Sequence, residues 1–356
     1  MKTIEETRKE IEAIDSQIVT LLAQRQACAK VIGENKMQAG TNVFVPDREE
    51  QLLKKLEAQA AALKIPCMNI RAVYREIISA SVALQMQKTV AYLGPAGTFT
   101  HQAALKIFGS SVDLSAMHTV GEALSALQAG KVAYAVLPIE NSSAGTVAEV
   151  LDLLAETDLQ IVAQTQMKIE QCLICRGRLE DIHAVYSKDV AISQCTEWLR
   201  HNLPRAELFN TPSTAVAVKY AMENPNAAAI ASRVAAEING VPVLEYGIQN
   251  LEENVTRFIV VATQKNRPCE NCSEKTTLSV LVKNEVGTLL HILQPFEKNG
   301  INVEGLTSRP VPGRKWEYRF FLDFFAAWDD ERFQKALKEL EPDVVSIKCL
   351  GSYPTV

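Results

Sequence analysis

The most constraining feature of this sequence is a long proline-free segment at its start, residues 4–37. Its apolar residues recur at spacings of three, four and seven, at Ile4, Ile11, Ile14, Ile18, Leu21, Leu22 and Ile32. This spacing sets them along one face and predicts a single helix about 50 Å long. Residues 1–88 as a whole predict three long, thin helices, which lack a proper core of their own. This favours an intertwined dimer.

Two more helices are predicted, from Pro46 to about residue 63 and over 69–87. Steps of seven residues from Ile4 along the first helix reach Arg25, which therefore lies on the apolar face. A cation there is unfavourable unless it is paired. Lys36 returns to nearly the same face about three turns later, so the two cations could reach one small dianion. Arg8 points elsewhere, and is either a surface residue or serves a pocket of a partner chain.

Several motifs of residues 1–88 resemble those of the all-helical chorismate mutase family. They are Thr7-Arg8, Leu21-Leu22-Ala23-x-Arg25, Lys36, Pro46-x-Arg48-Glu49 and Ser81-Val82-x-x-Gln85. The resemblance implies that the arginines bind the two carboxylates of chorismate, with Arg8 reaching across a dimer. It implies that Lys36 and Gln85 contact the ether oxygen, that Glu49 binds the ring hydroxyl and that Ser81 lines the pocket. A Claisen rearrangement needs only geometry and donors on the departing oxygen, with no base, metal or cofactor.

Residues 89–265 alternate strands and helices, which predicts two α/β lobes with a cleft at the strand ends. The expected strands are 90–93, 132–137, 183–186 and 227–231, with a polar loop beginning at Pro138. The apolar run 258–261 predicts a buried strand, and Thr256 and Arg257 stand just before it. Such a pair could polarise a leaving oxygen and bind a carboxylate. Arg257 could equally be a structural ion-pair residue.

The loops of this region resemble those of prephenate dehydratase. The motifs are Gly94-Pro-x-Gly-Thr-Phe99, Pro138-Ile-Glu-Asn-Ser142, Ser187-x6-Gln194-Cys195 and Asn254-x-Thr-Arg-Phe258. The resemblance implies that prephenate binds between two lobes and that Thr256 is the essential hydroxyl. The supporting site residues would be Thr98, Phe99, Glu140, Asn141, Ser187, Gln194 and Arg257. Two rivals remain open: arogenate as the substrate, and an amino-acid-sensing binding protein without catalysis.

Residues 264–275 are polar and predict a linker, after which 275–356 show the order βαββαβ of a ferredoxin-like fold. Gly287-x-Leu289, Gly300-Ile-Asn302 and Ser308-Arg-Pro310 resemble an ACT regulatory domain. The resemblance implies side-by-side dimers that bind phenylalanine near Gly287, Leu289, Asn302, Ser308 and Arg309. Thr307 stands where that family has Glu. A dimerisation module without a ligand is the alternative.

Bulk properties bound the remaining possibilities. A length of 356 residues predicts two or three domains, and a net charge of −5 argues against nucleic acid as the main partner. No segment is apolar enough for a membrane helix, and the charged N-terminus is unlike a signal peptide. Eight scattered cysteines suit reduced thiols in a cytoplasm. The pair Cys269 and Cys272 lacks histidines at zinc-finger spacing, which disfavours a structural zinc site.

Together these features predict a multidomain chain: an all-α module, a two-lobed α/β module and a ferredoxin-like α+β module. The resemblances imply a bifunctional enzyme of phenylalanine biosynthesis. It would rearrange chorismate to prephenate, convert prephenate to phenylpyruvate and be inhibited by phenylalanine. No cofactor or metal is expected, and the assembly is expected to be a dimer or a larger homo-oligomer.

Overall fold

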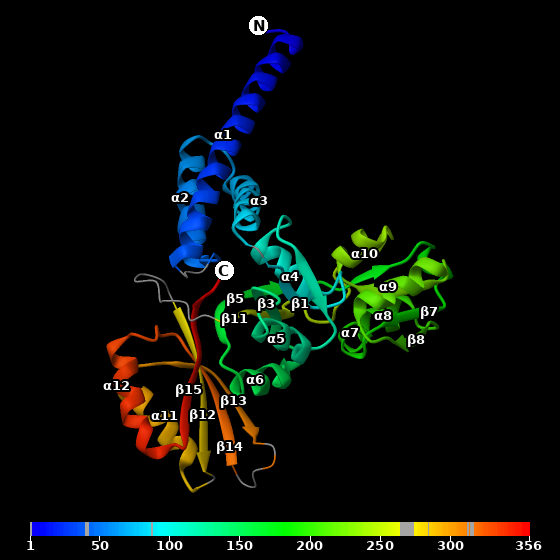
Figure 1. The fold of residues 1–356 in the computed structure, drawn as a ribbon. Helices are drawn as coiled ribbons and strands as arrows, with labels where there is room; N and C mark the ends of the chain where they lie inside the picture. Colours follow the sequence, from blue (N-terminus) through cyan, green and yellow to red (C-terminus); the bar gives the residue numbers. More distant parts are fainter. Residues whose placement is uncertain are drawn as a thin grey trace. The chain divides into compact units, whose positions relative to one another are not determined.

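The computed structural model describes residues 2–39, 43–86, 88–263, 274–283, 285–311, 313 and 317–356. The chain forms two compact units (Figure 1). The helical unit comprises residues 1–89 and 108–113, and the α/β unit comprises residues 90–107 and 114–356. Cys269 and Cys272, the pair considered for zinc, lie outside the described residues.

The helical unit contains α1 (Ile4–Ala39), α2 (Pro46–Ala62) and α3 (Cys67–Gln85), so the predicted long first helix is confirmed. With 36 residues, α1 is about twice as long as α2 (17 residues) or α3 (19 residues). Its apolar stripe is open to solvent, since Ile14 is 54% and Leu21 is 63% exposed. Among the described side chains of α1, only Ala29 and Gly33 are buried.

The first lobe of the α/β unit is built on a mixed sheet in the order β2-β1-β3-β11-β5. Its strands are β1 (Val90–Leu93), β2 (Leu114–Met117), β3 (Tyr134–Asn141), β4 (Gly145–Thr146), β5 (Gln160–Lys168) and β11 (Val255–Ala262). Its helices are α4 (Phe99–Phe108), α5 (Val120–Gln128) and α6 (Ala148–Ala155). The buried strand predicted at 258–261 is confirmed, because β11 lies between β3 and β5 and is antiparallel to both.

Strand β3 corrects one expectation, since it continues through the segment predicted as a loop from Pro138 and ends at Asn141. Phe258 pairs with Pro138 and Arg257 pairs with Glu140, which makes Ile139 an extra residue on β3. A β-bulge of this kind tolerates a proline that cannot donate to the ladder. Beyond the bulge, Asn141 lies directly opposite Thr256.

The second lobe has a sheet in the order β10-β6-β9-β7-β8. Its strands are β6 (Cys172–Ile174), β7 (Ala184–Ser187), β8 (Glu207–Asn210), β9 (Ala227–Ala231) and β10 (Val243–Glu245). Its helices are η1 (Leu179–Asp181), α7 (Asp189–Gln194), α8 (Thr196–Asn202), α9 (Thr214–Glu223) and α10 (Arg233–Asn239). The strands predicted at 183–186 and 227–231 are confirmed. Cys172 is fully buried, which raises the pKa of its thiol to about 11 and suits a reduced core cysteine.

The C-terminal sheet module, residues 274–356, has the predicted βαββαβ order. Its elements are β12 (Glu274–Lys283), α11 (Thr288–Lys298), β13 (Val303–Pro310), β14 (Glu317–Phe324), α12 (Glu331–Leu340), η2 (Glu341–Asp343) and β15 (Ser346–Pro354). The sheet order β13-β14-β12-β15 confirms the ferredoxin-like fold. Glu274 and Lys275, predicted as linker, already belong to β12, where they pair with β15.

This module shares a hydrophobic core with the first lobe. One face of its sheet packs on its own helices, through residues such as Leu278, Phe296 and Phe333. From the other face, Phe321, Leu350 and Tyr353 enter the hydrophobic core of the first lobe, which includes Ala135, Leu137, Ile259 and Val261. At Gly351, an added Cβ would lie 2.2 Å from the Ile161 carbonyl oxygen, so only glycine permits this approach of β15 to β5.

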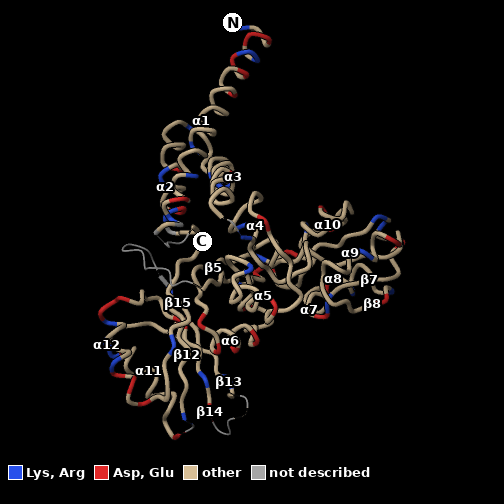
Figure 2. Tube along the Cα trace, viewed as in Figure 1, with Lys and Arg blue, Asp and Glu red and all other residues tan. Residues whose placement is uncertain are grey.

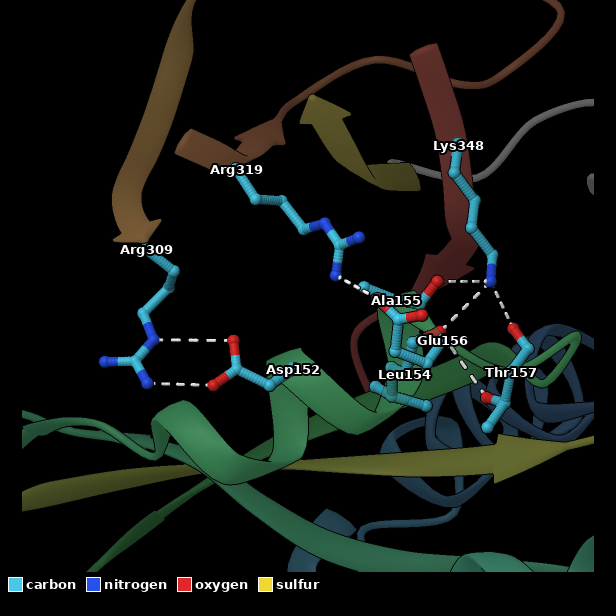
Figure 3. Close-up of polar contacts among 8 residues, drawn as sticks. All are labelled: Asp152, Leu154, Ala155, Glu156, Thr157, Arg309, Arg319 and Lys348. Atoms are coloured by element: carbon cyan, nitrogen blue, oxygen red, sulfur yellow. Dashed lines mark hydrogen bonds and ion pairs between the residues drawn. The ribbon is translucent and has the colours of Figure 1, made fainter. Parts of the chain in front are cut away.

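Charged contacts also join the C-terminal sheet module to the first lobe (Figure 3). Arg309 of the sheet module forms an ion pair with Asp152 of the first lobe at 2.8 Å, and Arg319 forms one with Glu156 at 2.7 Å. Lys348 Nζ donates to the carbonyl oxygens of Leu154, Ala155 and Thr157. Leu154 and Ala155 are the last two residues of α6 and Thr157 lies just beyond it, so the lysine helps to cap the C-terminal end of the helix.

Elsewhere, acidic and basic residues are interspersed along α1 and α12 (Figure 2). None of the helices in the described part of the chain combines the length and apolarity needed to cross a bilayer.

Candidate active sites

A cavity of about 240 Å³ lies among α1, α2 and α3. Six residues predicted for a dianion site line it: Arg25, Lys36, Arg48, Glu49, Ser81 and Gln85. Apolar side chains, including Ile32, Leu52 and Ile78, complete the wall. Arg8 is exposed and is not one of the lining residues, which agrees with the expectation that it cannot serve the pocket of its own chain.

Ser81 and Gln85, one turn apart on α3, both line this cavity. Arg25 Nη1 donates to the Ile77 carbonyl oxygen at 3.2 Å and also to Ser81 Oγ. Gln85 Nε2 donates to the Ser81 carbonyl oxygen at 3.1 Å. The Arg25 guanidinium therefore has hydrogen-bond acceptors at the α1–α3 interface, as a half-buried cation needs. Both of these contacts are made by Nη1.

Burial tunes the charges of the pocket. It lowers the pKa of Lys36, and the cation of Arg48 lowers it further. It raises the pKa of Glu49 to about 7, against the opposing influence of Arg75 and Lys36. Glu49 thus titrates near neutrality, whereas an exposed glutamate would be fully ionised there.

Gly33 and Gln85 are in close contact across the α1–α3 interface. A Cβ at Gly33 would lie 2.7 Å from Gln85 Cγ and 3.1 Å from Gln85 Cβ. Among the described residues, Gln85 Oε1 is one of the few buried side-chain oxygens without a hydrogen-bond partner. The role of Gly33 was not predicted from the sequence, because it depends on a contact with another helix.

The second site is a hydrogen-bonded cluster around Thr256, on β11. Asn141 Nδ2 donates to Thr256 Oγ1 and to Asn254 Oδ1, both at 2.8 Å. Asn141 Oδ1 accepts from the backbone N–H groups of Ser143 and Ala144, which fixes the orientation of the amide. Because Thr256 Oγ1 accepts a hydrogen bond from Asn141, the hydroxyl hydrogen of Thr256 can be donated to another group.

Two further amides, those of Gln194 and Gln171, extend the cluster into the second lobe. Gln194 Oε1 accepts from Asn254 Nδ2 at 3.1 Å and from Gln171 Nε2 at 3.2 Å. Asn254 belongs to a quoted motif and Gln171 immediately precedes β6, but neither was predicted as a site residue. A signal existed for Asn254 alone, since it stands two residues before Thr256.

The remaining predicted residues lie in other settings. Ser187 is fully buried, and its hydroxyl donates to the Ile230 carbonyl oxygen at 2.6 Å. Thr98 accepts from the His101 N–H at the start of α4, and Phe99 follows it, half-buried. His101 Nδ1 accepts from the Gly97 N–H, and burial lowers the pKa of the imidazole.

Arg257 and Glu140 lie on the opposite face of the sheet from Thr256, since neighbouring residues of a strand point to opposite faces. Arg257 Nη2 is 3.3 Å from Glu140 Oε2 and 2.5 Å from Asp323 Oδ2 of the C-terminal sheet module. Burial lowers the pKa of Arg257, but the negative charges of Asp323 and Glu140 outweigh it and the pKa is raised. Of the two alternatives for Arg257, this pairing matches the structural ion pair.

A third hollow, also about 240 Å³, lies at the start of α11. Gly287 and Leu289 line it with Lys283, Tyr318 and Phe320. The other residues predicted for phenylalanine are not among its lining residues: Asn302 and Ser308 are exposed, and Arg309 is paired with Asp152. Among the described residues, no group of three or more metal-ligating side chains is present.

Comparison with known proteins decides the family. Residues 7–86 match the chorismate mutase type II family, residues 90–266 match prephenate dehydratase and residues 276–342 match the ACT domain. A bifunctional chorismate mutase/prephenate dehydratase of Aquifex aeolicus is 38% identical over 99% of this chain and 98% of its own. The chain belongs to the bifunctional chorismate mutase/prephenate dehydratases.

Two solved structures are also similar to this chain. Prephenate dehydratase from Arthrobacter aurescens in complex with L-Phe superposes with a TM-score of 0.69 and 32% identity, covering 75% of this chain and 90% of that one. GqqA, described as a novel type of quorum quenching acylase, superposes with a TM-score of 0.70 and 26% identity, covering 76% and 98%. This bifunctional enzyme therefore carries the chorismate mutase and prephenate dehydratase activities of phenylalanine biosynthesis, with chorismate and prephenate as substrates.

Proposed function

We propose that the cavity among α1, α2 and α3 is the mutase site and that Arg25 and Arg48 bind the carboxylates of chorismate. Lys36 and the second N–H of the Gln85 amide donate to the ether oxygen as its bond to carbon breaks and negative charge develops there. Glu49 binds the ring hydroxyl, and Ser81 holds Arg25 in place. The observation that supports this proposal is the gathering of six polar residues from three helices around one cavity.

The dehydratase site centres on Thr256, and its hydroxyl is the group that polarises the departing ring hydroxyl of prephenate. Decarboxylation breaks a carbon–carbon bond whose electrons complete the aromatic ring, while the hydroxyl leaves with a proton as water. Thr256 is suited to this step because Asn141 occupies its oxygen as acceptor and leaves its O–H to donate. Thr98, Phe99, Gln194 and Ser187 support the cleft, while Glu140 and Arg257 act from the other face of the sheet.

Phenylalanine is the proposed inhibitor, bound at the hollow near Gly287 and Leu289. An L-Phe complex of a related prephenate dehydratase supports this ligand. A second copy of the chain would complete the site with Asn302, Ser308 and Arg309, and would bring Arg8 to the mutase pocket. We place the domains at residues 1–88, 89–265 and 275–356 and the enzyme in the cytoplasm.

One experiment tests the whole scheme: purified chain is supplied with chorismate, with and without phenylalanine, while prephenate and phenylpyruvate are followed by ultraviolet absorption. Both products should appear in sequence, and phenylalanine should slow the second step. Arogenate offered in place of prephenate distinguishes the two acids. Binding of prephenate without any phenylpyruvate would contradict the proposed role of Thr256.

The dimer has its own test in the exposed stripe of α1. Ile14→Glu should shift the chain toward monomer in sedimentation at micromolar concentration, since the stripe would then carry a charge. Val190→Glu, at another exposed apolar position in the second lobe, is the matched control and should leave the assembly unchanged.

A further inference from the structure

The residue that pairs most closely with Arg257 comes from the regulatory part of the chain. Asp323 lies on β14 of the C-terminal sheet module, is 8% exposed, and reaches Arg257 Nη2 at 2.5 Å. The Arg257 side chain is 13% exposed, so both charges are removed from water. A buried charge that loses its partner is strongly unfavourable, which ties the position of one side chain to the other.

Asp323 is itself held on the other side. Thr277 Oγ1 donates to Asp323 Oδ1 at 2.6 Å and lies 2.6 Å from the Tyr353 hydroxyl. Tyr353 is fully buried in the core that the sheet module shares with the first lobe. The carboxylate therefore has one oxygen fixed by its own module and the other committed to Arg257.

Arg257 transmits this restraint to the dehydratase site. It directly follows Thr256 on β11, and its partner across the ladder, Glu140, directly precedes Asn141 on β3. The ion pairs of Arg257 with Asp323 and Glu140 thus clamp both strands on one face, while Thr256 and Asn141 meet on the other. The bulge at Ile139 is what brings these two pairs into line.

The same strand, β14, also reaches the hollow at the start of α11, through Tyr318 and Phe320. Phe320 and Asp323 are three residues apart, about 10 Å along a strand. Movement of β14 on occupation of that hollow would be felt at Asp323.

We infer that Asp323 is a positioning residue of the dehydratase, which acts through Arg257 and Glu140 to hold Thr256 and Asn141 in register. This inference rests on the proposed role of Thr256. The regulatory sheet thereby supplies part of the support of the dehydratase site, and β14 is the element through which an effector alters the rate.

The test compares Asp323→Asn with Arg319→Gln in the full-length chain. Asparagine keeps the shape and an acceptor for Thr277 but removes the charge. Arg319 lies on the same strand and face and makes an ion pair with Glu156 of the first lobe, far along the strand from Arg257. Asp323→Asn should lower the dehydratase kcat at least tenfold with KM changed less than threefold, and should leave the mutase rate unchanged. Arg319→Gln should leave the dehydratase kcat within twofold.

Two companion variants keep the outcome decisive. Thr277→Val removes the hydroxyl that holds Asp323 and also contacts Tyr353, and it should lower the dehydratase kcat about threefold. It serves as the test if Asp323→Asn proves insoluble. Arg257→Lys combined with Asp323→Asn should lose no more than Arg257→Lys alone, because both act on one clamp. Equal losses in Asp323→Asn and Arg319→Gln, or a dehydratase kcat within twofold of the original in Asp323→Asn and Thr277→Val, would overturn the inference. Thr256→Ala, measured in parallel, separates this failure from an error in the role of Thr256.

Discussion

The two units of this enzyme complete their surfaces in opposite ways. The α/β unit covers the inner face of its regulatory sheet with its own first lobe, through a core that includes Phe321 and Tyr353. The helical unit leaves the stripe of α1 exposed, with Ile14 and Leu21 more than half accessible. We propose that a second copy of the chain completes the mutase site, whereas the sheet module of the same chain supports the dehydratase site. Variants that disable one activity and spare the other test this separation.

The largest effect is expected for Thr256→Ala. Loss of a single donor to a developing negative charge costs about 10²–10³ in rate. The dehydratase kcat should fall by about that factor, while the mutase rate in the same chain stays the same. Thr256→Ser, which keeps the hydroxyl, is the control and should retain most of the activity. A dehydratase rate within fivefold of the original in Thr256→Ala would remove this hydroxyl from the mechanism.

Arg25→Ala makes the complementary cut in the helical unit. A hydrogen bond to a charged group contributes roughly 1.5–3 kcal/mol, so mutase kcat/KM should fall about tenfold to a hundredfold. Dehydratase turnover of added prephenate should be unchanged. Arg178→Ala, at an exposed ion pair of the second lobe, is the control for loss of a surface guanidinium. Equal mutase rates in Arg25→Ala and Arg178→Ala would place Arg25 outside the substrate contacts.

Gly33→Ala sharpens the comparison without touching a charge. The added methyl group would press on Gln85, and overpacking of this kind costs about 1–3 kcal/mol. We expect mutase kcat to fall about tenfold as Gln85 shifts, although alanine is the better helix former. Kinetics with chorismate measure the effect, and Ala29→Gly reports the opposite change in helix propensity on the same helix. An unchanged kcat with a higher melting temperature would show that Gln85 moves aside freely.

The smallest effect concerns the pH dependence of the mutase. Glu49 has its pKa raised from 4.5 to about 7 in the folded chain, so the folded state binds this proton more tightly. Its contribution to the free energy of unfolding is therefore present below pH 4.5 and is lost as pH rises through about 7. The neutral form also repels the dianionic substrate less, so mutase kcat/KM should fall a fewfold between about pH 6 and pH 8.

Glu49→Gln should flatten that part of the pH profile and leave the dehydratase profile unaltered. A profile that keeps its inflection in Glu49→Gln would assign the titration to another group.

Local patterns predicted the elements well and their long-range pairing poorly. The stripe of α1, the strand at Phe258–Val261 and the βαββαβ order follow from periodicity and turn residues, which act over a few positions. The bulge at Ile139 could not be predicted, because it depends on how β3 meets a strand more than a hundred residues later.

The candidate sites show the same division. Arg25 and Lys36 could be grouped from helix spacing, Gln85 from the resemblance to chorismate mutases, and Thr256 from its motif. The pairing of Arg257 with Asp323 was out of reach, since no periodicity joins two strands of different modules. Gly33 was missed for the same reason.

The shared core has a consequence for how such chains diversify. The inner face of the C-terminal sheet module carries Phe321, Leu350 and Tyr353, so removal of the module would expose hydrophobic surface on the module and on the first lobe. An ACT domain from an unrelated enzyme could replace this module only if its sheet presented the same hydrophobic surface and a carboxylate at the position of Asp323. The shared core therefore limits which domain exchanges are tolerated during evolution. Substitutions on the inner face of the sheet must be accompanied by compensating substitutions in the first lobe.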